Sequence, residues 1–193
     1  MDVYLNPIYS PEERSKDLLQ RLSLDEKMAQ TVCAFPSKPG NAQEALKNEP
    51  IGVGHVSTLE MRSLSSLDDC AAFQREMQKE IMERSPHRIP ALFHMEGLCG
   101  AYIQGAASFP SGVARGATWD PVLEREIGAI VGRQERCLGI TETLAPVLDI
   151  SRDNRMGRCA ETYGEDSTLA SAMVTARLAG LQPCLRSRLR IMP

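Results

Sequence analysis

Two segments of the sequence gather side chains that can hydrogen-bond a sugar. Glu96 directly follows the apolar run Ala91–Met95, and residues 152–166 contain three arginines among several carboxylates. A carboxylate accepts two hydrogen bonds at once from neighbouring hydroxyl groups, and a guanidinium donates in a fixed fork. This chemistry indicates a polyol ligand. The structural alternative is that ion pairs within residues 152–166 only hold a long loop together.

Both segments follow short apolar runs that are expected to be strands. Residues 91–95 and 144–150 have the composition of strands buried on both faces, and residues 51–56 are interpreted as a further short strand. Helices are expected at about residues 67–83, 121–138 and 167–180. About four strand–helix units indicate an α/β fold with a mostly parallel sheet. Ligands bind such sheets at the carboxyl ends of the strands, where both polar segments lie.

The N-terminal part of the chain is expected to contain two short helices that start in the same way. Ser10–Glu13 and Ser23–Glu26 each place a glutamate three residues after a serine cap. Met28 and Val32 are expected to continue the inner face of the second helix. Trp119 stands just before a helix start and is expected to anchor that helix by packing.

Length and composition exclude several classes of protein. The 193 residues suggest one domain and fall short of the roughly 250 that a complete eight-fold barrel needs. A net charge of −3 and 5% aromatic residues give neither the field nor the stacking surface for nucleic acid. No apolar run approaches the roughly 18 residues of a membrane span. The cysteines form no Cys-x-x-Cys pair, so neither a metal nor another cofactor is expected.

The remaining reactive residues favour structural roles. The sequence opens without a signal peptide, so its six cysteines are expected to be reduced and the protein cytoplasmic. His94 lies inside an apolar run and is expected to be a core histidine. Cys99 could alternatively be the nucleophile of a thiol-dependent enzyme, but this role needs a base that the sequence does not identify.

Two longer motifs resemble one enzyme family. Residues 106–120 (AASFPSGVARGATWD) and 145–166 (APVLDISRDNRMGRCAETYGED) resemble signatures of glycoside hydrolase family 3, the β-glucosidase and β-xylosidase family. The LSLDEKMAQ segment also resembles the opening of that family. The resemblance covers residues 1–182 apart from the first few. It implies an incomplete (β/α)8 TIM-barrel-like domain, about the first half of the barrel. Residues 183–193 are interpreted as a divergent, arginine-rich tail.

The resemblance also implies roles for particular residues. Glu96 matches the acidic residue that binds sugar hydroxyls next to the scissile bond, and Arg158 matches an arginine that contacts the same sugar. Many members have aspartate at the first position. The longer glutamate occurs in xyloside-active relatives and gives a modest preference for a xyloside. Tyr102 stands where some relatives carry a further sugar-binding arginine, and Cys99 where a histidine is common.

The activity implied is that of a retaining O-glycosyl hydrolase that releases terminal β-D-glucose or β-D-xylose from β-linked glucosides, xylosides or oligosaccharides. Retention needs a nucleophile and an acid/base carboxyl group. The family places both beyond a Lys-His pair that this sequence lacks. We therefore expect no catalytic residue in this chain and no activity of the chain alone, with a missing C-terminal portion or partner chain supplying the rest. A non-catalytic sugar-binding fragment and one half of a split barrel are the alternatives.

Overall fold

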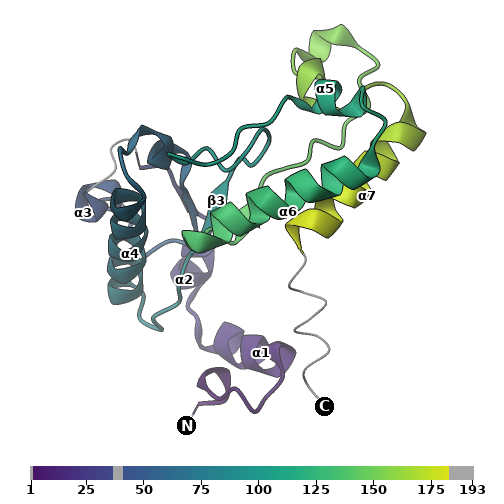
Figure 1. The fold of residues 1–193 in the computed structure, drawn as a ribbon. Helices are drawn as coiled ribbons and strands as arrows, with labels where there is room; N and C mark the ends of the chain where they lie inside the picture. The colour runs from purple at the N-terminus through teal and green to yellow at the C-terminus, as the bar shows by residue number, and fades with distance from the viewer. Residues whose placement is uncertain (1, 37–40, 183–193) are drawn as a thin grey trace.

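The computed structural model describes residues 2–36 and 41–182, so the expected tail at 183–193 lies outside the described residues. Strands and helices alternate along the chain (Figure 1). The elements in order are η1 (Val3–Leu5), α1 (Pro11–Arg21), α2 (Leu24–Ala29), β1 (Cys33–Ala34), α3 (Ala42–Ala45), β2 (His55–Ser57), η2 (Leu59–Ser63), α4 (Leu67–Arg84), β3 (Leu92–Met95), α5 (Gly112–Gly116), α6 (Pro121–Cys137), β4 (Glu142–Thr143), η3 (Asn154–Met156), η4 (Cys159–Glu161) and α7 (Ser167–Leu181).

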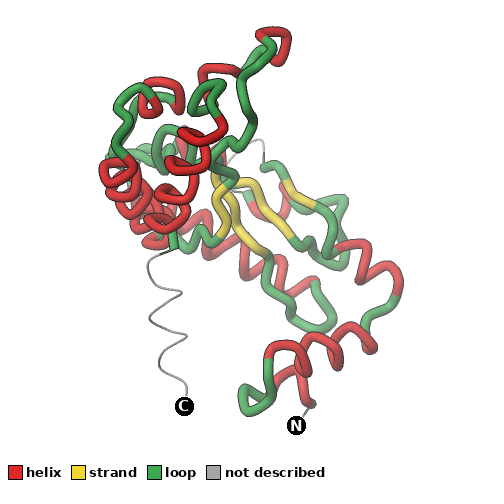
Figure 2. Tube along the Cα trace, turned by 90° about the vertical axis from the view of Figure 1, so that its right-hand side faces the viewer, coloured by secondary structure: helices red, strands yellow, loops and turns green. Residues whose placement is uncertain are grey.

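The four strands form one sheet in the order β1-β2-β3-β4, and every neighbouring pair is parallel. Figure 2 shows these strands at the centre of the molecule with helices around them. The register aligns His55 with Leu92 and His94 with Glu142. Each strand therefore neighbours the next strand in sequence, as repeated βα units require. This arrangement confirms the predicted α/β class and the parallel sheet.

The prediction of a strand at residues 144–150 is wrong. β4 lies just before it, and the amide of Leu144 donates the last bond to the adjacent strand, to the Met95 carbonyl oxygen at 2.9 Å. Pro146 has no amide hydrogen to extend the pairing. Leu144 and Leu148 are 47% and 63% exposed, so the run is not buried. An apolar run is fixed as a strand only by a neighbour that pairs with it, and composition alone does not reveal that neighbour.

The two predicted helix starts are confirmed, since Ser10 and Ser23 each complete a capping box. The second helix is shorter than expected. It ends at Ala29, Met28 is exposed, and the following residues lead into β1, which the sequence did not indicate. Trp119 does not anchor α6 by packing, because 70% of its surface is exposed and its backbone turns with φ +56°.

Helix α4 covers one face of the sheet and matches the helix expected at residues 67–83. Phe73, Met77 and Ile81 on α4 are buried together with Phe93 and Met95 on β3. Burying each such side chain contributes about 1.5–3 kcal/mol of transfer free energy. This packing fixes β3, and with it the point at which the chain leaves the sheet at residue 96.

Helices α6 and α7 run side by side on the other part of the molecule (Figure 1). A β-carbon added to Gly180 of α7 would lie 2.1 Å from the Arg125 carbonyl oxygen of α6, so only glycine permits this approach. Helix α6 buries charged residues as well as apolar ones. Leu123 is 41% exposed, whereas the charged residues Glu124 and Glu135 are buried.

Candidate functional site

The two predicted sugar-binding residues lie at the carboxyl edge of the sheet. Glu96 directly follows β3, and Arg158 lies in the long connection between β4 and α7. The pKa of the Arg158 guanidinium is raised, mainly by its hydrogen bonds to Glu161 and more weakly by the charges of Glu96 and Asp149. The charge of Glu96 thus acts on Arg158, although the two residues are 62 apart in sequence.

The Glu96 carboxylate is available to a ligand. The residue is half-buried, and in the described part of the chain its carboxylate takes part in no hydrogen bond or ion pair. Gly97 turns the chain immediately afterwards with φ +64°, a conformation that side chains disfavour. The Glu96 carboxylate oxygens therefore lie at the edge of the sheet with their lone pairs unoccupied, as acceptance of two hydrogen bonds from sugar hydroxyls requires.

The Arg158 side chain is exposed to solvent, but two hydrogen bonds to a neighbouring carboxylate fix its orientation. Its Nε and Nη2 atoms donate to the two Glu161 oxygens at 2.8 and 2.7 Å. This fork leaves the Nη1 atom available to donate to a ligand. Arg155 makes a comparable pair with Asp153. The structural alternative for this loop is therefore partly right, because two of its three arginines do pair with neighbouring carboxylates.

The other residues considered near Glu96 have different surroundings. The Tyr102 hydroxyl accepts a hydrogen bond from the Cys99 amide at 3.3 Å, and burial chiefly raises the pKa of the Tyr102 phenol, with Glu96 adding to it. His94 is buried, its Nε2 atom lies 3.5 Å from the Cys33 sulfur, and burial lowers its pKa. These contacts match the core role predicted for His94.

The sequence did not predict a buried polar cluster that contacts two loops, the turn after β3 that carries Glu96 and the connection between β4 and α7 that carries Arg158. The Glu124 carboxylate accepts hydrogen bonds from Arg115 Nε at 2.9 Å and from the Tyr163 hydroxyl at 2.5 Å. Arg177 Nη1 lies 3.9 Å from the same carboxylate. All four residues are nearly inaccessible to solvent. Burial is the main reason that the pKa of Tyr163 is raised to about 12.

The cluster extends to the ends of β3 and β4. Arg177 Nη2 donates to the Gly97 carbonyl oxygen at 2.8 Å. The Thr143 hydroxyl donates to Glu135, whose Oε1 atom has no hydrogen-bond partner in the described structure. Burial raises the pKa of Glu135 to about 7. Buried charges therefore lie directly behind the turn that carries Glu96.

The sequence did contain a signal for this cluster. Glu124 and Glu135 fall on the same helical stripe as Ile127 and Val131, at spacings of three, four and seven residues. Arg177 similarly shares a stripe of α7 with Met173. A charged residue at an inward position must be paired, because its burial alone is costly. Charged residues at inward positions of a predicted helix therefore indicate a buried network of paired charges.

Helix α5 presses against the loop that contains Arg158. A β-carbon on Gly112 would lie 2.1 Å from the Glu161 carbonyl oxygen, and one on Gly116 would lie 2.4 Å from that of Tyr163. The two glycines are one helical turn apart and form one face of α5. They let the segment that directly follows Arg158 pack against the helix, so that this end of the loop has a fixed position.

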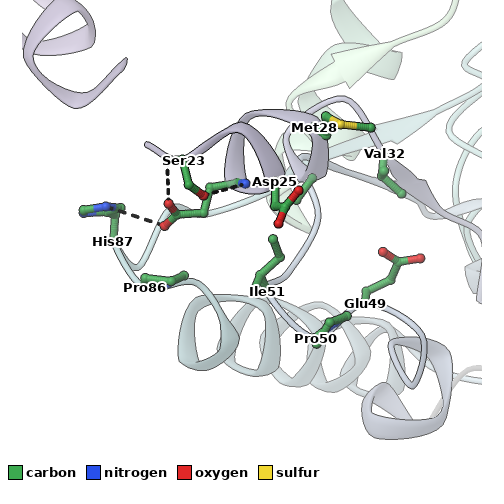
Figure 3. Close-up of a pocket in the computed structure, with 11 residues that line it drawn as sticks. Ser23, Asp25, Met28, Val32, Glu49, Pro50, Ile51, Pro86 and His87 are labelled. Carbon is green, nitrogen blue, oxygen red and sulfur yellow. Dashed lines mark hydrogen bonds and ion pairs between the residues drawn. The ribbon is translucent and has the colours of Figure 1, made fainter. Parts of the chain in front are cut away.

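A cavity of about 770 Å³ lies at the opposite end of the sheet (Figure 3). Met28 and Val32 precede β1, Ile51 precedes β2, and His87 precedes β3, so the cavity faces the amino ends of the strands. Glu96 and Arg158 are not among its lining residues. The cavity is therefore separate from the predicted sugar-binding residues.

Within residues 2–36 and 41–182, no group of three or more His, Cys, Asp or Glu side chains is arranged to hold a metal ion. In the same residues, no helix is both long and apolar enough to cross a membrane.

Parallel βα units around one sheet define an α/β protein, and in such folds ligands bind at the carboxyl ends of the strands. The model of the glycosyl hydrolase family 3 N-terminal domain matches residues 23–186, and the chain belongs to that family. This membership confirms the resemblance found in the sequence motifs.

The relatives of the chain are named as glycosidases. It is 32% identical over 187 residues to a putative beta-xylosidase of Formosa agariphila, covering 93% of this chain and 25% of that protein. It is 28% identical over 197 residues to beta-glucosidase C of Emericella nidulans, covering 94% of this chain and 31% of the relative. The chain thus spans between a quarter and a third of the length of these relatives.

Solved structures share the fold. The β-glucosidase EmGH1 of Erythrobacter marinus superimposes with a TM-score of 0.80 at 29% identity, over 94% of this chain and 24% of the other. This similarity confirms that the four-stranded sheet belongs to a TIM-barrel-like domain, of which the chain forms a part.

Proposed function

We propose that this chain forms the sugar-binding part of a retaining β-glycosidase that acts on β-glucosides, β-xylosides or the corresponding oligosaccharides. The observation that supports the proposal is that Glu96 and Arg158 both lie in segments that follow strands of the sheet, with the charge of Glu96 contributing to the raised pKa of Arg158. The carboxylate accepts from two adjacent hydroxyls of the terminal sugar, and the guanidinium donates to a further oxygen of the same sugar. The names of the relatives support both glycones.

Glu96 is assigned to binding rather than to bond cleavage. Retaining hydrolysis needs two carboxyl groups about 5–5.5 Å apart, one as nucleophile and one as acid and base. We propose that residues beyond this sequence supply both, from a C-terminal portion or a partner chain. In the described structure β1 and β4 each pair with one neighbour, and their other edges are available to the strands of the remaining barrel.

Binding of monosaccharides tests the site. Calorimetric titration of the chain with xylose and with glucose is expected to give saturable binding, tighter for xylose. Glu96→Gln and Arg158→Met are each expected to weaken it at least about ten-fold, the size of one charge-assisted hydrogen bond. Arg155→Met is the matched control, because Arg155 lies in the same loop with an equivalent carboxylate partner. Absence of binding to both sugars, or equal loss in the control, would refute the proposed site.

Hydrolysis tests the assignment of roles. The purified chain is expected to leave aryl β-glucosides and aryl β-xylosides intact, since binding groups alone do not cleave a glycosidic bond. Release of the aryl group by the wild-type chain, abolished by Glu96→Gln, would instead assign chemistry to Glu96.

We also propose a cytoplasmic location, to be checked by cell fractionation.

A further inference from the structure

The Glu124 carboxylate contacts side chains from three other segments of the chain. It projects from α6 and has no exposed surface. Its Oε1 atom accepts the Tyr163 hydroxyl at 2.5 Å, and Arg177 Nη1 lies 3.9 Å from the same oxygen. Its Oε2 atom accepts from Arg115 at 2.9 Å. One carboxylate is thus in contact with residues that lead to both loops.

The path toward Glu96 runs through Arg177. Its Nη2 atom donates to the carbonyl oxygen of Gly97, the residue after Glu96, at 2.8 Å. The Nε and Nη1 atoms of Arg177 make no hydrogen bond in the described structure. The guanidinium therefore forms a long ion pair with Glu124 on one side and donates a hydrogen bond to the backbone of the Glu96 turn on the other.

The path toward Arg158 runs through Tyr163. This residue lies five positions after Arg158 in the same connection, and its ring is buried with its hydroxyl on Glu124. Between them, Glu161 holds Arg158 by two hydrogen bonds while its own carbonyl group packs against Gly112 of α5. Fixing Tyr163 therefore fixes the end of the segment from which Arg158 projects.

A buried ion pair is weak support for stability, since removing two charges from water costs about as much as their attraction returns. The Glu124–Arg177 pair has a second effect, because it connects the two loops. We propose that Glu124 and Arg177 are positioning residues that set the placement of Glu96 relative to Arg158, and so the affinity for the terminal sugar. This inference rests on the proposed function.

The test compares Arg177→Met with Arg136→Met. Both variants remove an arginine that donates to a backbone carbonyl oxygen in the same part of the molecule, but Arg136 bonds Leu181 and not the Glu96 turn. Arg177→Met is expected to weaken xylose binding at least about ten-fold, as does the loss of a residue that orients a ligating side chain in metal sites. Arg136→Met is expected to retain the affinity within about two-fold. Arg177→Lys, whose ammonium still donates to the Gly97 carbonyl group, is expected to recover part of the lost affinity.

Hydrogen exchange separates this inference from the proposed function. Amides of residues 96–100 and 159–164 are expected to exchange faster in Arg177→Met than in Arg136→Met, without any sugar present. Unchanged exchange, or unchanged affinity in a folded Arg177→Met, would overturn the inference. If the wild type binds no sugar but the exchange difference appears, the proposed function fails and the positioning of the loops stands.

A second variant covers the case in which Arg177→Met does not fold. Tyr163→Phe removes only the hydroxyl group that donates to Glu124. It is expected to weaken xylose binding and to accelerate exchange in residues 159–164. Wild-type exchange and affinity in Tyr163→Phe would contradict the role of Glu124 in holding the second loop.

Discussion

The Glu135 carboxyl group and the Gly97 backbone lie against each other. A β-carbon on Gly97 would lie 3.0 Å from Glu135 Oε1 and 2.1 Å from the Thr143 methyl group. The turn that carries Glu96 is thus packed on a buried acid of α6. This relationship makes the ionisation of Glu135 and the absence of a side chain at residue 97 relevant to the predicted sugar-binding residues.

Glu135 is expected to make the stability of the protein fall as the pH rises. Burial raises the pKa of its carboxyl group from 4.5 to about 7 in the folded state. The group therefore stabilises the fold fully below pH 4.5, and this contribution is lost as the pH rises through 7. The shift corresponds to about 3 kcal/mol. Denaturant unfolding of the wild type and of Glu135→Gln between pH 4.5 and 8 measures the difference.

The matched control for that series is Glu126→Gln, which changes an exposed acid of the same helix. The Glu135→Gln variant is expected to lose less stability than the wild type as the pH rises through this range, whereas Glu126→Gln follows the wild type. Parallel curves for all three proteins would show that Glu135 does not carry the pH dependence.

Gly97→Ala is expected to destabilise the fold and to weaken xylose binding. The substitution places a side chain at φ +64° and brings it into contact with Thr143 and Glu135. Gly105→Ala separates the two effects, because Gly105 has φ +77° and nothing within 4 Å of an added β-carbon. The positive φ alone costs about 1 kcal/mol, and overpacking adds about 1–3 kcal/mol at residue 97. Equal losses of thermal stability in both variants would contradict the close packing at Gly97.

Glu161→Gln is expected to weaken sugar binding with little change in stability. The Arg158–Glu161 pair is largely exposed on its arginine side, and such pairs contribute at most about 1 kcal/mol to stability. The substitution removes the carboxylate charge and one of the two oxygens that accept hydrogen bonds from Arg158, so the guanidinium is less firmly oriented. The affinity for xylose is therefore expected to fall about three- to ten-fold. Asp153→Asn changes the equivalent pair with Arg155 and serves as the control. A similar fall in affinity in both variants would mean that the loop as a whole, not Arg158, was disturbed.

The features that the sequence predicted are those with local causes. The serine caps at Ser10 and Ser23 act within one helical turn, and α4 follows the spacing of its own apolar residues. Glu96 was located because β3 is a short apolar run with a polar residue directly after it. Its role beside Arg158 stays a prediction, based on the motifs and on the rule that parallel strands end at one edge.

The features that were missed depend on distant partners. The two-residue strand β1 exists only because β2 pairs with it, and the run 144–150 is not a strand because in the described structure no neighbour pairs with it beyond Leu144. Trp119 is exposed although its size favours burial. Glu124 and Arg177 are inward charges whose partners come from other helices. Periodicity shows which face a residue occupies, but not which charge will meet it there.

The position of each strand in the sheet has a consequence for ligand binding. β3 is paired on both sides, whereas β4, which leads to the loop of Arg158, is a two-residue strand paired with β3 in the described structure. Glu96 therefore extends from the strand with two paired neighbours, and we expect the connection between β4 and α7 to lose more conformational entropy when a sugar binds. Ligand binding is accordingly expected to rigidify residues 151–160, which precede the segment packed on α5, more than residues 96–100.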